Sequence, residues 1–401
     1  MMSDSDINIL CLFKGSYPKG QAMANRLRNY ADAICSEDVD FTVASEGQKV
    51  NRVTKDVLFD GHKVYHWRKK SKWDRLPFIR DLSALFHRVE LYRYIISYKE
   101  YNVLFSSGYR WPQMIAILCI AKLTKRKYII ELNELPHSIK ARRMDTTFSN
   151  ALKRFITIRC IFPFVDGFIC ISKELEQLLE PVVSKSCKII RIPILTNVPS
   201  TPLNSARLSS DFIFHAGTLT NYKDGIETVF EAYGKAVRDH GLALRYEFSN
   251  FNTLPAIKNK INKIISQYEL QDLVTFHNYL SKEELHLKLE SCYMVVINKP
   301  NNIRNKYNFS TKLGECMGFG IPIITTAFGD SELFLEDDKN ALIIGDSSDS
   351  DQLALLMNSL YSDKELAKRI GLEARKTAEQ EFHYSNYRKA LKNYFLALNN
   401  G

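Results

Sequence analysis

The densest group of residues that could do chemistry lies within residues 307–325, at the start of an expected helix and along its first turns. Ser310 or Thr311 can cap a helix through its hydroxyl, and the free backbone N–H groups of that helix then face a bound anion. Glu315 follows one turn later, on the same helical face as Thr311 and Lys312. Its carboxylate can accept paired hydrogen bonds from the two vicinal hydroxyls of a ribose. The pattern therefore indicates a site for an anion and a ribose.

A second candidate anion site follows the strand that we expect at residues 211–216. Gly217 would let backbone amides approach a diphosphate, and Lys223, near the start of the next helix, adds a positive charge. The alternative interpretation of Lys223 is a solvated surface residue. The position of this segment, between a strand and the next helix, favours a role in ligand binding.

The loop after the first expected strand contains Gly15 and Gly20 at the spacing of a phosphate-binding P-loop. Gln21 and Ala22 stand where that loop needs Lys and Ser or Thr, so an ATPase site is excluded. Two interpretations remain. The loop is either a flexible segment whose backbone approaches a ligand at the strand's carboxyl end, or a plain turn between strand and helix.

The elements that position these residues are short β-rich runs that alternate with helical stretches. Most runs are nearly continuously apolar and do not alternate, as expected for strands covered by helices on both faces. Apolar residues at helical spacing from Ile226 to Val237 predict a helix that ends at Gly241. We expect strands at residues 8–13, 41–44, 103–106, 128–132, 167–171, 188–192, 211–216, 244–248, 274–278, 294–298, 322–326 and 341–344. This order predicts an α/β protein with two Rossmann-like, doubly wound parallel sheets.

Residues 193–209 carry three prolines and no hydrophobic period, which is typical of a linker. We therefore expect an N-terminal Rossmann-like acceptor domain over residues 1–198 and a C-terminal donor domain over residues 199–383. The last helical stretch, residues 384–399, has no strand after it. It either covers the second sheet or packs back on the first domain, and we favour the latter.

Composition sets further limits. The chain has 401 residues, 45% hydrophobic and 25% charged, the mix of a globular protein. Residues 1–198 hold 32 Lys and Arg against 20 Asp and Glu, whereas the rest hold 23 against 25. The basic half suggests an anionic partner, either nucleic acid or an acidic membrane surface. The eight cysteines form no C-x-x-C pair and predict buried thiols in a reducing cytosol. No charged-then-apolar leader opens the chain, so we expect a cytoplasmic location.

Residues 211–340 resemble the donor domain of retaining glycosyltransferases of family 4, which have the GT-B fold of two Rossmann-like domains facing across a cleft. The segment Lys312-Leu-Gly-Glu-Cys-Met-Gly-Phe-Gly-Ile-Pro is similar to the family's Lys-x-x-Glu-x-Met-Ala-x-Gly-x-Pro. In the first half, Tyr17-Pro-Lys-Gly-Gln-Ala with Arg26 resembles the family's acceptor-side loop. Residues 131–136 and 166–172 resemble its strand ends.

The resemblance implies roles for individual residues. The donor nucleotide-sugar would be bound by Gly217, Thr218, Tyr307, Ser310, Thr311 and Glu315. The groups assisting catalysis would be Lys223, Lys312 and Glu315. The acceptor would be bound by Gly15, Tyr17, Gly20, Arg26 and Glu134. Tyr307 stands where the family has a first Glu, and Thr218 where it has a loop arginine, so Lys223 and Lys312 must carry more of the diphosphate's charge.

The expected reaction moves a sugar, a hexose or N-acetylhexosamine, from a nucleotide-diphosphate sugar to a glycan, with retention at the anomeric carbon. UDP is favoured over GDP, and the nucleotide-sugar is a co-substrate, so no cofactor is expected. Lysines and backbone amides would stabilise the leaving diphosphate without a metal. Asp38-Val-Asp40 has the Asp-x-Asp pattern of metal-dependent transferases, but a turn before a strand explains this common tripeptide.

Partners follow from the basic half. Trp67 and Trp73 flank a basic run, which predicts docking on the anionic inner face of the membrane and a lipid-linked glycan acceptor in surface polysaccharide assembly. Solvated loops are the alternative. A nucleic-acid-binding protein is a rival, but we expect no nucleic acid because no reader motif occurs and the basic residues are dispersed. A sugar-nucleotide epimerase of the same fold and a catalytically inactive homologue are further rivals.

Overall fold

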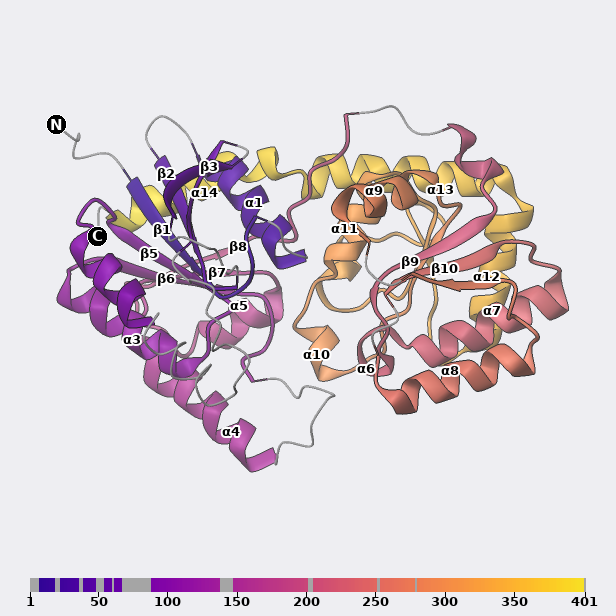
Figure 1. Cartoon of the computed structure of the whole chain (residues 1–401), viewed down its shortest axis with the longest axis horizontal. Coiled ribbons are helices and arrows are strands. Elements are labelled where there is room, and N and C mark those ends of the chain that lie inside the picture. The colour runs from indigo at the N-terminus through magenta and orange to yellow at the C-terminus, as the bar shows by residue number, and fades with distance from the viewer. Residues whose placement is uncertain are drawn as a thin grey trace. The chain divides into compact units, whose positions relative to one another are not determined.

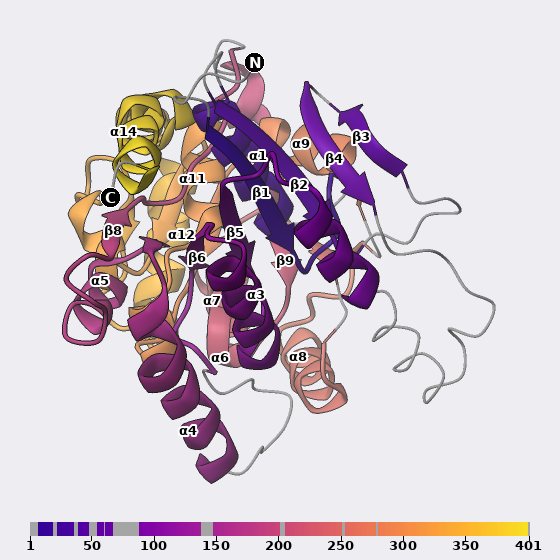
Figure 2. The same cartoon turned by 90° about the vertical axis from the view of Figure 1, so that its left-hand side faces the viewer.

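The computed structural model describes residues 7–18, 22–35, 39–47, 54–59, 61–66, 88–137, 147–200, 205–250, 253–277 and 280–399. The chain divides into two compact units, coloured along the chain in Figures 1 and 2. The first comprises Met1–Ile139, Asp145–Leu195 and Tyr384–Gly401, and the second Lys140–Met144 and Thr196–His383. Gly20, Asp38 and the Trp67–Trp73 stretch lie outside the described residues.

The first unit contains one sheet of eight described strands in the order β3-β4-β2-β1-β5-β6-β7-β8. Its neighbouring strands pair in parallel, except in the antiparallel β3–β4 hairpin. The strands are β1 (Ile7–Phe13), β2 (Val39–Ser45), β3 (Thr54–Phe59), β4 (His62–His66), β5 (Val103–Ser107), β6 (Lys127–Leu132), β7 (Gly167–Cys170) and β8 (Lys188–Arg191). Every residue of β1 is buried, because helices cover both faces of the central strands.

The helices of the first unit include a π-helical stretch and two 3₁₀ turns. They are α1 (Ala22–Ile34), α3 (Trp111–Leu123), α4 (Thr147–Phe155), the π-helix η2 (Ile156–Ile161), η3 (Phe162–Phe164), α5 (Lys173–Leu179), η7 (Tyr384–Tyr387) and α14 (Arg388–Asn399). Residues 88–97 are also helical. The chain's last helix belongs to this unit, since Leu391, Phe395 and Leu398 lie in its hydrophobic core.

The second unit has two runs of parallel strands, β11-β10-β9 and β12-β13-β14. The strands are β9 (Phe212–Thr218), β10 (Arg245–Asn250), β11 (Val274–Phe276), β12 (Val295–Ile297), β13 (Ile323–Thr325) and β14 (Leu342–Ile343). The runs join because Phe214 donates its N–H to the Met294 oxygen at 3.2 Å and Tyr293 donates to the Phe212 oxygen at 2.8 Å. The strand order therefore reverses between β9 and β12, as in a doubly wound fold.

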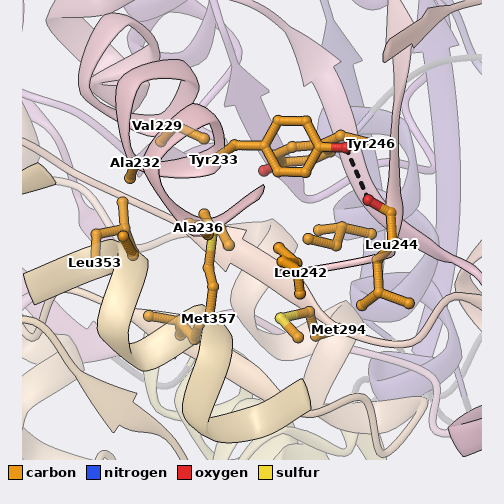
Figure 3. Packing of buried hydrophobic residues seen from close by; sticks show 14 of the residues in the cluster. Val229, Ala232, Tyr233, Ala236, Leu242, Leu244, Tyr246, Met294, Leu353 and Met357 are labelled. Atoms are coloured by element: carbon orange, nitrogen blue, oxygen red, sulfur yellow. Dashed lines mark hydrogen bonds between the residues drawn. The ribbon is translucent and has the colours of Figure 1, made fainter. Parts of the chain in front are cut away.

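Helices cover this second sheet. They are η4 (Ser205–Ser209), α6 (Asn221–Asp224), α7 (Ile226–His240), α8 (Pro255–Gln267), α9 (Lys282–Ser291), α10 (Ile303–Lys306), α11 (Thr311–Gly318), η5 (Gly329–Leu333), α12 (Ser350–Ser362), α13 (Lys364–Thr377) and η6 (Ala378–Phe382). Figure 3 shows the core where α7 packs on the sheet and on α12. Within it, the Tyr233 hydroxyl donates to the Leu244 oxygen at 2.7 Å.

The sequence-based fold assignment is confirmed at each of the twelve predicted strands, with bounds shifted by up to two residues. The predicted end of α7 is also confirmed, since Gly241 caps it in the left-handed region at φ 68°. Strands β3 and β4 were not predicted, because their mixed polar sequences give no apolar run. The expectation of buried thiols is wrong for Cys119 and Cys160, which are exposed.

Arg207 in η4 connects two helices of the second unit through hydrogen bonds. It is 5% exposed, and its guanidinium donates to the backbone oxygens of Leu289 (2.9 Å), Cys292 (2.7 Å) and Phe319 (3.1 Å). These oxygens lie at the carboxyl ends of α9 and α11. One side chain therefore donates hydrogen bonds to carbonyl groups that have no partner within the helices.

We expect Arg207→Leu to lower the free energy of unfolding by about 2–4 kcal/mol, because three backbone oxygens lose a charged donor. The exposed Arg238→Leu is the control and should change it by less than about 1 kcal/mol. Urea unfolding followed by circular dichroism measures both. Equal effects of the two substitutions would contradict the assigned role.

Candidate functional site

Charged side chains gather where the strand order of the second unit reverses. His215 lies in β9, Asp224 ends α6, and Lys312 is the second residue of α11. Lys223 precedes Asp224, and Lys299 follows β12. In open α/β sheets, ligands bind outside the carboxyl ends of the strands at this reversal. The second unit therefore carries its candidate site at the position the fold favours.

Lys312 is the centre of this group. Its ammonium donates to Asp224 Oδ1 at 3.2 Å and lies 3.4 Å from His215 Nε2. The side chains of Lys312 and Asp224 are 19% and 4% exposed. An ammonium has only donors, so His215 Nε2 must accept and the imidazole is neutral. Asp224 and His215 thus hold Lys312 in one position.

The pKa values reflect this crowding. Burial lowers the pKa of His215 to about 3, and the Lys312 cation adds to the effect. Burial alone would raise the pKa of Asp224, but Lys312, with Lys299 and Lys223, holds it below its usual value. Burial also lowers the pKa of Lys299 to about 7, against the opposing effect of Asp224. Three lysines thus surround one carboxylate, an excess of positive charge that a diphosphate would neutralise.

The backbone at the end of β9 fits closely against Lys312. Gly217 has φ 107°, and a Cβ built there would lie 3.0 Å from Lys312 Cε, so only glycine fits. The Gly217 N–H donates to Ser249 Oγ at 2.7 Å. This amide, predicted from the sequence to approach a diphosphate, is therefore already hydrogen-bonded to a side chain. The side chain of Thr218 lies outside the described residues.

Side chains of the segment after β12 hold the α6 turn, which carries Lys223, in place. Three buried or half-buried asparagines donate to its backbone oxygens: Asn298 to Gly225 at 3.5 Å, Asn302 to Tyr222 at 2.7 Å and Asn305 to Lys223 at 3.5 Å. Gly225 is in the left-handed region, and a Cβ there would lie 2.6 Å from Asn298 Nδ2. These contacts fix the turn before any ligand arrives.

Helix α11 begins where the sequence predicted. Ser310 is its N-cap residue, but its hydroxyl makes no capping hydrogen bond, contrary to expectation. Thr311, Lys312 and Glu315 are partly exposed and share one face of the helix. Tyr307 caps the carboxyl end of α10 and is also partly exposed. The structure therefore brings Gly217, Lys312 and Asp224 into contact and places Glu315 one turn further along α11.

A pocket of about 580 Å³ adjoins the same α6 turn. Asn221 and Tyr222 of α6, Leu254 and Ile257 near α8, and Pro300 form part of its wall. The lining contains neither Lys312 nor Glu315 and no charged side chain. It offers hydrogen bonds and apolar contact, but no cation for a diphosphate.

The predicted acceptor residues of the first unit that the structure describes differ in how far they are exposed. Gly15 follows β1, and its oxygen accepts from Ser45 Oγ at 2.9 Å. Tyr17 is wholly buried in the hydrophobic core, where burial raises its pKa. Glu134 is exposed after β6. Of these, Gly15 and Glu134 reach the surface, and Tyr17 does not.

Arg26 lies inside the first unit, at 4% exposure. Its Nε is 2.8 Å from Glu131 Oε1, and Nη2 donates to the Tyr30 hydroxyl at 3.1 Å. Glu131 also accepts from Ser107 Oγ. These contacts join α1 to the ends of β5 and β6, so Arg26 positions the strand ends around which an acceptor would bind.

Sequence reasoning missed His215, Asp224, Lys299 and the three asparagines. Position offered a signal for some of them: His215 stands two residues before Gly217, and Asp224 follows Lys223 directly. Asn298 ends a predicted strand whose carboxyl end lies at the same sheet edge as that of β9, and Lys299, Asn302 and Asn305 follow it. None of these residue types reveals its partner without the fold.

No group of three or more His, Cys, Asp or Glu side chains that could hold a metal ion occurs among the described residues. Asp40 is exposed and pairs with Lys63. Metal independence remains a prediction.

The architecture and the site define a class. The chain has the GT-B glycosyltransferase fold: sucrose-phosphate synthase from Thermosynechococcus elongatus matches with a TM-score of 0.72 at 15% identity, over 96% of this chain and 98% of that one. Anabaena Alr3699/HepE in complex with UDP-glucose matches with 0.65 at 13% identity, over 96% and 98%. Residues 207–377 match the family described as Glycosyl transferases group 1, so a domain of that family is present.

A relative of similar length agrees with this class. The O-antigen chain mannosyltransferase C of Escherichia coli is 20% identical over 363 residues, which cover 87% of each chain. The family domain spans the whole of the charged group described above, from His215 to Lys312.

Because His215 is neutral in the folded chain, the free energy of unfolding should depend on pH. Its pKa of about 3 lies below the 6.5 of an ordinary histidine, so the unfolded chain binds more protons as the pH falls, and the free energy of unfolding decreases. Between about pH 7 and pH 5 this amounts to about 2 kcal/mol. His215→Gln keeps an acceptor for Lys312 without titrating, so its unfolding free energy should fall by about 2 kcal/mol less. Urea unfolding at each pH measures this, with exposed His240→Gln as control; parallel curves for all three proteins would contradict it.

Proposed function

We propose that this protein is a retaining, metal-independent glycosyltransferase of family 4 that moves a hexose or N-acetylhexosamine from a nucleotide-diphosphate sugar to a glycan. The observation that carries the proposal is the group of three lysines around Asp224 at the strand reversal, beside the start of α11. Such a group suits a diphosphate. The group 1 domain at residues 207–377 supports the same reaction.

The proposed roles follow from position. Lys312, oriented by Asp224 and His215, binds the diphosphate together with Lys223 and Lys299. Glu315, one turn along α11, accepts hydrogen bonds from the ribose hydroxyls. Tyr307 and Thr311 flank the sugar and phosphates at the same helix start. Because the cations are held before binding, they stabilise charge that develops on the leaving group without rearrangement.

The chemical step then needs no protein base. The bond between the anomeric carbon and the diphosphate oxygen breaks, and the lysines stabilise the charge on the nucleoside diphosphate. The acceptor hydroxyl attacks from the same face, and its proton passes to the departing phosphate oxygen. The new glycosidic bond therefore keeps the donor's anomeric configuration.

The donor and acceptor are proposed from the relatives. A UDP-sugar is favoured over a GDP-sugar, since the similar Anabaena structure is a complex with UDP-glucose. A relative described as an O-antigen chain mannosyltransferase supports an acceptor in surface polysaccharide assembly. A lipid-linked glycan, used at the cytoplasmic face of the membrane, is the form of acceptor we propose.

A panel of UDP- and GDP-sugars, incubated with the protein and a glycan acceptor in excess EDTA, tests the proposal. We expect nucleotide release with at least one UDP-sugar, because the charge is stabilised by lysines and not by a metal. The anomeric coupling constant of the product by NMR should match that of the donor. Turnover that needs added Mn²⁺, or inversion, would contradict the mechanism. Conversion of the sugar without transfer would indicate an epimerase, and binding without turnover an inactive homologue.

Glu315→Ala should weaken donor binding by about 1–3 kcal/mol while leaving the fold intact, because the ribose loses two hydrogen bonds to a carboxylate. Isothermal titration with the nucleoside diphosphate measures binding, and thermal unfolding checks the fold. Glu283→Ala, on the exposed side of α9, is the matched control and should bind like the parent. Parent-like affinity of Glu315→Ala would exclude the ribose contact.

A further inference from the structure

Large apolar side chains reach solvent on one continuous helical segment of the first unit. α4, η2 and η3 run without a break from Thr147 to Phe164. Leu152 is 50% exposed, and Phe155 and Phe164 are each 59% exposed. The opposite side of the segment is anchored: Thr157, Ile161 and Phe162 are buried. The segment therefore presents large apolar side chains both to the core and to solvent. A surface helix normally keeps its apolar side chains toward the core.

The neighbouring helix α3, which contacts η2, repeats the feature. Its outward positions carry Ile115 at 37% exposure and Leu123 at 84%, with the exposed thiol of Cys119 between them. Only Gln113 and Lys122 of its thirteen residues are polar. A helix that is apolar on all sides normally has a further partner.

The charged residues of the helices that carry these side chains are all basic. The sequences of α3 and of α4–η3 contain no acidic residue. Lys153 and Arg159 lie on α4 and η2, and Lys122 and the exposed Lys125 lie at the end of α3. Lys122 pairs with Asp166, which is 22% exposed. An apolar surface bordered by cations is complementary to anionic lipid headgroups over acyl chains.

We propose that the outer side of α3 and α4–η3, with Leu152, Phe155 and Phe164 at its centre, is a docking face that inserts into the interfacial layer of an anionic membrane. The face lies on the unit proposed to hold the acceptor, and it gives the lipid-linked acceptor of the proposed function a physical route to the protein. It does not depend on the Trp67–Trp73 stretch, from which the sequence suggested membrane contact. No described helix is long and apolar enough to span a bilayer.

Flotation with phosphatidylcholine vesicles, with and without phosphatidylglycerol, tests the face. The full chain should float with the anionic vesicles and much less with the neutral ones, and added salt should weaken binding. The triple substitution Leu152→Ser, Phe155→Ser and Phe164→Ser should lower the bound-to-free ratio at least about tenfold. Lys153→Gln with Arg159→Gln should lower it on anionic vesicles alone.

The control is a triple substitution of equally exposed residues of the second unit, Leu287→Ser, Leu333→Ser and Leu355→Ser, at 64%, 61% and 52% exposure. It should bind vesicles like the parent. The proposal is overturned if the parent does not bind, if it binds neutral vesicles equally well, or if both triple variants behave alike. A concentration-dependent dimer that the first triple variant abolishes would assign the face to self-association instead.

Binding of a nucleoside diphosphate separates this proposal from the proposed function. It should be the same in the parent and in both triple variants, because none of the substituted residues belongs to the charged group around Lys312. A parent that floats but binds no nucleotide would overturn the transferase while leaving the docking face. A parent that binds nucleotide but does not float would do the reverse.

Discussion

The candidate site depends on the ion pair between Lys312 and Asp224. The two residues are 88 positions apart in the chain, yet their side chains join the start of α11 to the end of α6 at the strand reversal. Removing either partner would leave a charge in a poorly solvated position, which is far more costly than losing a surface pair. Lys312 therefore links the start of α11 to the end of α6 through Asp224 and to β9 through His215.

Asp224 also resolves an electrostatic conflict. Three lysines within one site repel one another, and burial lowers the pKa of Lys299 to about 7. A single carboxylate cannot neutralise Lys312, Lys223 and the protonated fraction of Lys299. The remaining positive charge is held in place by Asp224, by neutral His215 and by the asparagines that fix the α6 turn. Such a site is set for an anion with two or more charges, and it needs little rearrangement to bind one.

Local patterns predicted the fold well where burial was complete. Strands such as β1 and β12 are short, almost wholly apolar and buried, so their sequences identify them. The β3–β4 hairpin at the sheet edge was missed, because one of its faces need not be apolar. Ser310 was placed correctly at the start of α11, but its hydroxyl does not cap the helix. Position in the chain was predictable, and the hydrogen bond was not.

The sequence by itself determined the α/β class, the α7 helix and its end at Gly241, and the positions of Gly217, Lys312 and Glu315 at strand and helix ends. These follow from residue periodicity and from backbone preferences, which are local. Tertiary structure alone decided that Lys312 meets Asp224 and His215, that Arg26 and Tyr17 turn inward, and that Phe155 and Leu152 face outward. Each of these outcomes depends on which distant segment covers a side chain. A one-dimensional pattern cannot specify that, because burial and pairing arise only when the chain is closed into a fold.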